Sequence, residues 1–187
     1  MSKLSSAKTF GGVGSILMLV GPIIPAIGTA IALAGLILVF VAVKYISDET
    51  KDQEIFKNYL ISFIFSIIAF IVAGFVLVAG IFGSLMSFAN PSLALATFFG
   101  SLVLAFIILW IVLILSAIFL RKSYNSISAK TRVEIFSTTA TAYLIGAVLI
   151  IVLIGLIVLF LAMILQIVAF FSLPESIETS ASEIVKK

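Results

Sequence analysis

Few side chains within the long uncharged stretches of this sequence could do chemistry, and Gln166 is the most conspicuous of them. It is the one amide or charged side chain deep inside such a stretch, and Thr138 and Thr141 add hydroxyls to the same stretch. Amides and hydroxyls donate and accept hydrogen bonds, but they are not strong acids or bases. We therefore interpret Gln166, Thr138 and Thr141 as possible intramembrane polar contacts, made either to neighbouring helices or to a neutral solute.

The sequence offers no assembled catalytic, metal-binding or cofactor-binding constellation. Cys and His are both absent, which removes thiolate nucleophiles and imidazole bases or ligands. Asp48, Asp52 and Glu54 could gather a divalent cation, because hard cations favour carboxylates. The lysines interleaved with them are more typical of a solvated helix start. We predict that the protein is not an enzyme and has no cofactor. The net charge of +3 is also too small to predict a nucleic-acid partner.

The charged residues are confined to four short islands. The 11 basic and 8 acidic residues all lie within residues 3–8, 44–57, 121–134 and 175–187, and the segments between these islands contain 35, 63 and 40 residues. The chain is 63% hydrophobic and only 10% charged, whereas soluble domains are about half apolar and about a quarter charged. This pattern predicts an integral protein of the cell membrane, with the lipid bilayer as its principal partner.

Each uncharged segment is long enough for two membrane crossings. One crossing needs about 20 helical residues, because a helix rises 1.5 Å per residue and the hydrocarbon core is about 30 Å thick. Residues 21–25, residues 80–91 and Gly155 carry the glycines and prolines that would end a helix in each segment. The predicted helices span residues 4–20, 26–46, 53–79, 91–121, 132–153 and 156–172.

The predicted fold is therefore an all-α transmembrane bundle of six helices in three hairpins. The hairpins cover residues 4–46, 53–121 and 132–172 of a membrane domain at residues 1–174, and residues 175–187 form a cytoplasmic polar tail. Four long spans are the alternative. Because Lys and Arg concentrate in cytoplasmic loops, six helices place all 11 of them on one side, whereas four spans divide them seven to four. Both termini are thus predicted to be cytoplasmic.

Short polar patterns suggest local structure and an internal repeat. Residues 6–9 and 128–131 have the same sequence, which is either a trace of repeated hairpins or a chance match. Thr50 with Gln53, and Thr131 with Glu134, have the spacing of a capping box at a helix start.

Small residues recur three or four apart along several predicted helices. This spacing favours close helix packing, with a pore lining or a dimer face as the functional alternative. The stripes are Ala7, Gly11 and Ser15; Ser62, Ser66, Ala69 and Ala73; Thr97, Ser101 and Ala105; and Thr138, Ala142 and Gly146.

Five segments resemble a family of small archaeal and bacterial multi-spanning membrane proteins of unknown function. They are residues 5–15, 42–48, 58–60, 143–147 and 169–174. The resemblance covers almost the whole chain and implies a membrane location, but it carries over no functional residue. We expect a non-enzymatic scaffold or an accessory subunit of a membrane complex, with other membrane subunits or a second copy as partners. The alternative is a transporter or channel for a small neutral or apolar solute.

Overall fold

The computed structural model describes residues 3–175, which form a bundle of six α-helices. The predicted tail at residues 175–187 lies almost entirely outside this part of the chain. Short 3-10 turns join two of the helix pairs, η1 at Gly21–Ile23 and η2 at Ile150–Val152. All six helices are long and apolar enough to cross a membrane. The helices are α1 Lys3–Val20, α2 Gly28–Glu49, α3 Gln53–Met86, α4 Pro91–Thr131, α5 Ile135–Leu149 and α6 Ile154–Phe171.

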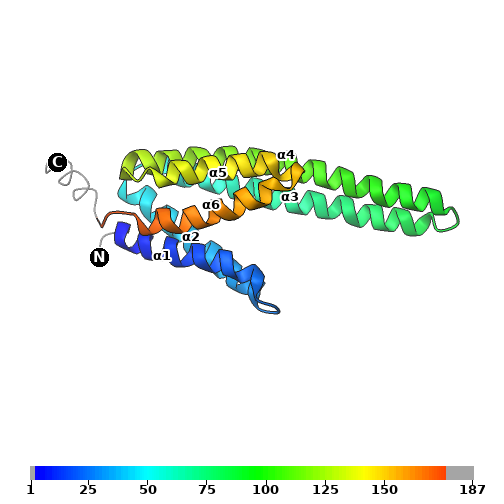
Figure 1. Cartoon of the computed structure of the whole chain (residues 1–187), viewed down its shortest axis with the longest axis horizontal. Coiled ribbons are helices and arrows are strands. Elements are labelled where there is room, and N and C mark those ends of the chain that lie inside the picture. The colour runs from blue at the N-terminus through cyan, green and yellow to red at the C-terminus, as the bar shows by residue number, and fades with distance from the viewer. Residues whose placement is uncertain (1–2, 176–187) are drawn as a thin grey trace.

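The six helices pack as three hairpins that close into a ring. α1 pairs with α2, α3 with α4 and α5 with α6, while α2 also contacts α3, α4 contacts α5, and α6 returns to α1. Figure 1 shows that the start of α1, the end of α6 and the α2–α3 and α4–α5 connections lie at one end of the bundle. The charged islands within the described residues are therefore at this end. The fold confirms the prediction of six helices, and the four-span alternative is wrong.

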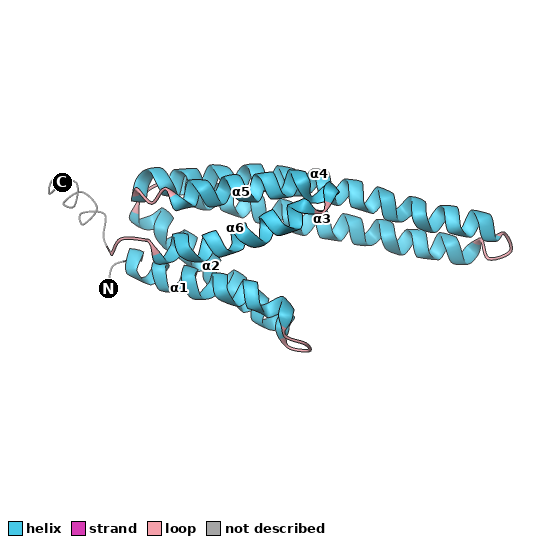
Figure 2. Cartoon of the chain, in the orientation of Figure 1, coloured by secondary structure: helices cyan, strands magenta, loops and turns pink. Residues whose placement is uncertain are grey.

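The α3–α4 hairpin is much longer than the other two. Its helices contain 34 and 41 residues, or about 51 and 62 Å, whereas the other four contain between 15 and 22 residues. Figure 2 shows this hairpin extending well beyond the ends of its neighbours. The exposed side chains of the extension are large and apolar, including Phe75, Phe82 and Met86.

The predicted ends of these two long helices were wrong. α3 continues past Ala79 to Met86, because Gly80 and Gly83 serve helix packing and do not break the helix: a Cβ on Gly80 would overlap the Ser101 side chain of α4. α4 continues past Arg121 to Thr131. Pro91 does begin α4, and Asn90 caps it through a 3.4 Å bond from the Leu93 N–H.

The turn between α5 and α6 is a true hairpin, as predicted, although its backbone geometry was not anticipated. The left-handed residue is Leu153, with φ of 62°, and Gly155 already lies inside α6. Gly155 is required for a close approach, since a Cβ there would meet the carbonyl oxygen of Gly146 and the backbone of Ile150. Gly155 therefore lies next to the turn because the start of α6 packs closely against the end of α5 there, and not because its backbone is left-handed.

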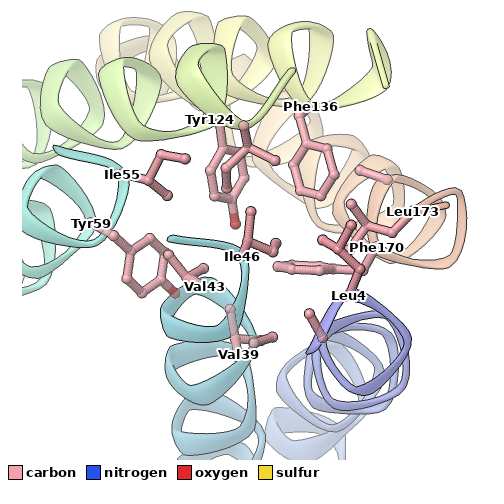
Figure 3. Close-up of a cluster of buried hydrophobic side chains, with 14 of the residues drawn as sticks. Leu4, Val39, Val43, Ile46, Ile55, Tyr59, Tyr124, Phe136, Phe170 and Leu173 are labelled. Atoms are coloured by element: carbon pink, nitrogen blue, oxygen red, sulfur yellow. The ribbon is translucent and has the colours of Figure 1, made fainter. Parts of the chain in front are cut away.

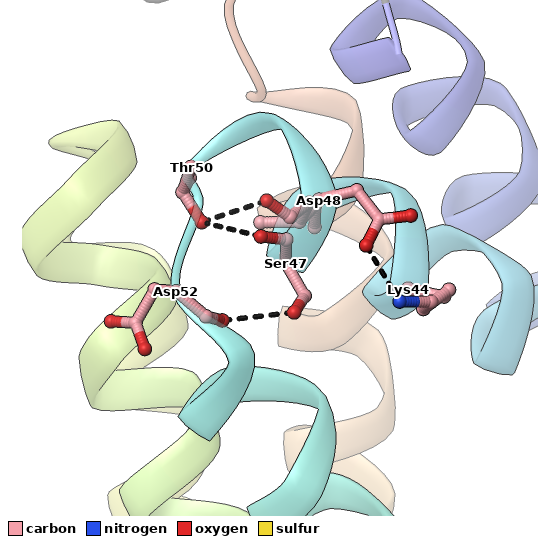
Figure 4. A network of polar contacts seen from close by, with 6 residues as sticks. Lys44, Ser47, Asp48, Thr50 and Asp52 are labelled. Atoms are coloured by element: carbon pink, nitrogen blue, oxygen red, sulfur yellow. Dashed lines mark hydrogen bonds and ion pairs between the residues drawn. The ribbon is translucent and has the colours of Figure 1, made fainter.

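The α2–α3 connection is held by hydrogen bonds that differ from the predicted capping box (Figure 4). The Thr50 hydroxyl donates backwards to the Ile46 carbonyl at 2.8 Å, so it closes α2 and does not start α3. Asp52 caps α3 by accepting the Glu54 N–H at 3.1 Å, and the Ser47 hydroxyl donates to the Asp52 carbonyl at 2.8 Å. The Asp52 cap therefore pairs one of the backbone N–H groups at the start of α3 that have no partner within the helix.

The second predicted capping box is also wrong. Thr131 donates to the Ile127 carbonyl at 2.8 Å and is the last residue of α4. The two copies of the four-residue pattern occupy different places, because residues 6–9 lie inside α1 and residues 128–131 end α4. The match between them does not mark equivalent positions of a repeat.

All six helices contribute to a buried apolar cluster near the charged end (Figure 3). At its centre the rings of Tyr124, Phe136 and Phe170 meet edge to face, with centroids 5.2 to 6.5 Å apart. Such pairs stabilise a bundle beyond the effect of area alone. The other buried members are Leu4, Ala7, Val39, Ala42, Val43, Ile46, Ile55, Tyr59, Ile127, Ala140, Ala169 and Leu173.

Candidate functional site

A cavity of about 270 Å³ lies inside the ring of helices, next to the buried apolar cluster. Tyr59 and Tyr124 belong to both the cavity lining and the cluster. None of the described residues that line the cavity is charged, and most of the lining is apolar. Every helix contributes to it, through Met18 of α1, Leu36 of α2, Phe63 of α3, Leu113 of α4, Ala147 of α5 and Leu159 of α6.

Gln166 links three helices on one wall of this cavity. Its side-chain oxygen accepts the Tyr143 hydroxyl of α5 at 2.8 Å, and its Nε2 donates to the Ser15 hydroxyl of α1 at 2.9 Å. The residue is only 5% exposed. The Gln166 amide is therefore a hydrogen-bonded link between α1, α5 and α6, and Tyr143 lines the cavity beside it.

Three serines form a second polar patch on the opposite pair of helices. The Ser116 hydroxyl of α4 donates to the Ser62 carbonyl of α3 at 2.8 Å, and it lies 3.0 Å from the Ser62 hydroxyl and 2.8 Å from the Ser66 hydroxyl. Small hydroxyl residues allow α3 and α4 to approach closely and to bond across the contact. All three serines line the cavity with their hydrogen-bonding capacity largely used.

Among the fully buried side-chain nitrogen and oxygen atoms of residues 3–175, the Tyr124 hydroxyl oxygen is the one without a hydrogen-bond partner. The residue is 0% exposed. Figure 3 shows its oxygen pointing away from α4 into the interior of the bundle. Buried hydroxyls are normally paired, so this one retains the capacity to donate to a water molecule or a ligand.

Thr138 and Thr141 lie apart from Gln166 and the cavity. Each donates to a carbonyl of its own helix, Thr138 to Glu134 at 3.5 Å and Thr141 to Ser137 at 3.0 Å. Both line a shallow, open groove between α5 and α6. Local bonds of this kind satisfy the hydroxyls without a ligand. Of the three predicted polar residues, only Gln166 lines the cavity.

Sequence reasoning missed the tyrosines of the cavity and one of its three serines, Ser116. Tyr124 lies inside a charged island, between Lys122 and Lys130, so the sequence indicated a solvated segment. Ser15, Ser62 and Ser66 were noted in stripes of small residues, interpreted as helix packing with a pore lining or a dimer face as the alternative. A helical projection of α4 would have provided a signal, because Ser116, Ala117 and Tyr124 recur on one face at spacings near seven.

The polar groups of the cavity lining are hydroxyls and one amide. No Asp, Glu, Lys, Arg or His side chain is among the described residues that line the cavity. Within residues 3–175, no group of three or more His, Cys, Asp or Glu side chains is placed to hold a metal ion. Hydroxyls and an amide can form hydrogen bonds with a neutral molecule in such apolar surroundings.

Comparisons with known proteins identify the family without indicating an activity. The chain is 36% identical over 177 residues to an uncharacterized protein of Methanocaldococcus jannaschii. The aligned region covers 95% of this chain and 97% of that protein. No solved structure matches the chain significantly. Residues 31–164 match the family described as "Protein of unknown function (DUF996)". The chain therefore belongs to the DUF996 family of proteins of unknown function.

Proposed function

We propose that the chain is a multi-pass integral protein of the cell membrane with both termini in the cytoplasm. Six apolar helices of spanning length support this placement. The gathering of the basic islands at one end of the bundle supports the orientation, because Lys and Arg favour the cytoplasmic side. The lipid bilayer is then the main partner of the exposed apolar surface.

Single cysteines test this orientation cleanly, because the chain contains no Cys. Ala89 lies in the turn between α3 and α4, and Ala129 lies near the charged end of α4; both are exposed. In intact cells, an impermeant thiol reagent should label the Ala89→Cys variant and leave the Ala129→Cys variant unlabelled until the cells are opened. The reverse pattern would overturn the orientation.

Within the membrane, the protein binds a small neutral solute inside the helix ring and serves as a carrier or passive path for it. The observation that carries this function is the uncharged cavity to which all six helices contribute. A charge would be expensive in such a place, so the solute is neutral. Carriers coupled to protons or ions hold charged groups near the midplane, and no charged residue lines this cavity, which favours an uncoupled path. No enzymatic activity is proposed.

A binding measurement with a filled cavity tests this function. We expect the purified chain in lipid nanodiscs to bind 4-ethylacetophenone saturably above the uptake of empty nanodiscs. Ala117→Leu adds bulk inside the cavity lining, whereas Ala96→Leu makes the same change on the exposed surface of α4. The first should abolish saturable binding and the second should preserve it. Equal uptake by protein-containing and empty nanodiscs would contradict the function.

A scaffold or accessory subunit is the second candidate, and the long α3–α4 hairpin favours it. Residues 58–86 and 91–120 are uncharged over about 44 Å, whereas the hydrocarbon core is about 30 Å thick. The excess is apolar, with Phe75 and Met86 being 75% and 86% exposed. Contact with another membrane subunit or a second copy would shield it.

Gentle extraction followed by native sizing separates the two candidates. A stoichiometric protein partner, or a homo-oligomer that dissociates when Phe75 and Met86 are changed to Ser, would support the second candidate. A monomer with saturable solute binding would leave the first standing alone.

A further inference from the structure

The Tyr124 side chain is held in place by its neighbours but lacks a partner for its hydroxyl. Its ring stacks on Tyr59 at 6.3 Å and meets Phe136 edge to face at 5.5 Å and Phe170 at 6.5 Å. These contacts come from three other helices, so the direction of the hydroxyl is set before any ligand arrives. A fixed, buried donor without an acceptor is the property of a preformed binding group.

Apart from the Tyr59 hydroxyl, the other polar groups of the cavity are already engaged. Gln166 accepts from Tyr143 and donates to Ser15, and Ser116 bonds to α3. A bound molecule that competed for these groups would break bonds between helices. The hydroxyls of Tyr124 and of its stacked neighbour Tyr59 are the groups whose pairing costs no existing bond, and that of Tyr124 is the fully buried one. A ligand is therefore recognised at this stacked tyrosine pair, and the rest of its surface meets apolar walls such as Leu113 and Leu159.

The cavity volume bounds the size of this ligand. A cavity of about 150 Å³ is known to hold benzene, so a cavity of about 270 Å³ holds about 11 non-hydrogen atoms. A molecule of this size can be one ring with two short substituents or a short branched chain.

We propose that the cavity is a binding site for a compact, mainly apolar molecule that carries one uncharged hydrogen-bond acceptor. The acceptor is the oxygen of a ketone, ether or alcohol, and the Tyr124 hydroxyl donates a hydrogen bond to it. This inference rests on the proposed function and specifies its substrate class. Tyr124 is the specificity-determining residue, because it distinguishes an oxygenated molecule from a hydrocarbon of the same shape.

Three probes of closely similar size and shape test the proposal on the full chain in nanodiscs. They are 4-ethylacetophenone, which has a ketone acceptor; 1-ethyl-4-isopropylbenzene, which replaces the acetyl group by an isopropyl group; and 4-ethylbenzoate, which is charged. Binding is measured by equilibrium dialysis against empty nanodiscs, so that partition into lipid is subtracted for each probe. The variants are Tyr124→Phe, which removes only the hydroxyl, and Tyr45→Phe, which makes the same change outside the cavity.

The proposal predicts a pattern across probes and variants. One hydrogen bond changes affinity by about two- to tenfold, so Tyr124→Phe should weaken ketone binding by about that factor and leave hydrocarbon binding unchanged. Tyr45→Phe should change neither, and the charged probe should not bind. Tyr124→Phe removes a hydroxyl but keeps the packing of the ring, so this variant should keep its fold. Thermal unfolding of the variant and the parent protein checks this.

The outcomes separate the proposal from the function on which it rests. If the ketone and the hydrocarbon both bind saturably, and Tyr124→Phe affects neither or both equally, the proposal is overturned while solute binding stands. If neither binds saturably above empty nanodiscs, the proposed function fails with it. Selective weakening of the ketone alone supports both.

Discussion

The contact between α1 and α2 provides a quantitative test of the packing, because two glycines face each other across it. A Cβ on Gly35 would lie 2.5 Å from the Gly14 carbonyl oxygen and 2.8 Å from both Leu17 Cβ and the Met18 amide nitrogen. Most of these atoms belong to the backbone or lie next to it, so they cannot move independently of α1. By contrast, a Cβ on Gly100 of α4 would meet nothing within 4 Å.

The two glycines should therefore respond to alanine with opposite signs. Overpacking costs about 1–3 kcal/mol, and replacing a helical glycine by alanine recovers about 0.5–1 kcal/mol. We expect Gly35→Ala to lower the free energy of unfolding by about 1 kcal/mol, which is a central overpacking cost of about 2 kcal/mol less a recovery of about 0.75 kcal/mol. Gly100→Ala should raise it by about 0.5–1 kcal/mol.

Equilibrium unfolding in mixed micelles with increasing dodecyl sulfate measures both changes. Trp110 is the only tryptophan, and its indole donates to the Val148 carbonyl of α5 at 3.2 Å, so its fluorescence reports the α4–α5 contact. Circular dichroism follows the helices independently. A Gly35→Ala variant at least as stable as the parent protein would refute the close approach of α1 and α2.

Three further predictions concern the polar groups. In a double-mutant cycle, Gln166→Leu and Tyr143→Phe should show a coupling energy of about 0.6 kcal/mol in unfolding, the average for hydrogen bonds between membrane helices, and additive effects would contradict the bond. Asp52→Ala should destabilise the protein by about 1 kcal/mol through loss of the α3 cap, whereas Glu49→Ala should stay within about 0.5 kcal/mol in the same titration. Thr138→Val should leave probe binding unchanged, and weaker binding would place Thr138 at the site.

The sequence was sufficient to predict the number of helices and their pairing, because these follow from bulk properties. The spacing of charged islands and the length of a membrane crossing gave six helices in three hairpins. Helix ends were predicted less well. Gly80 and Gly83 could be interpreted as a break, but they lie at a helix contact, where the absence of a side chain permits close packing. Single-sequence patterns do not distinguish these two uses of glycine.

The candidate site was predictable only in part, since a cavity depends on which helix faces meet. Gln166 was conspicuous because an amide in an apolar stretch is rare. Tyr124 was hidden among charges, although its position one turn beyond the apolar stretch directs it into the interior. Closure of the ring by α1 against α6 joins residues about 150 apart in sequence, such as Ser15 and Gln166 at a separation of 151, and no local pattern encodes that contact.

The most direct test of the central claim is a crystal structure of the full chain with 4-ethylacetophenone bound. We expect one probe molecule inside the helix ring, between α4 and α6, with its ketone oxygen within hydrogen-bond distance of the Tyr124 hydroxyl. A cavity filled by side chains, or a probe found only on the outer surface of the α3–α4 hairpin, would contradict it.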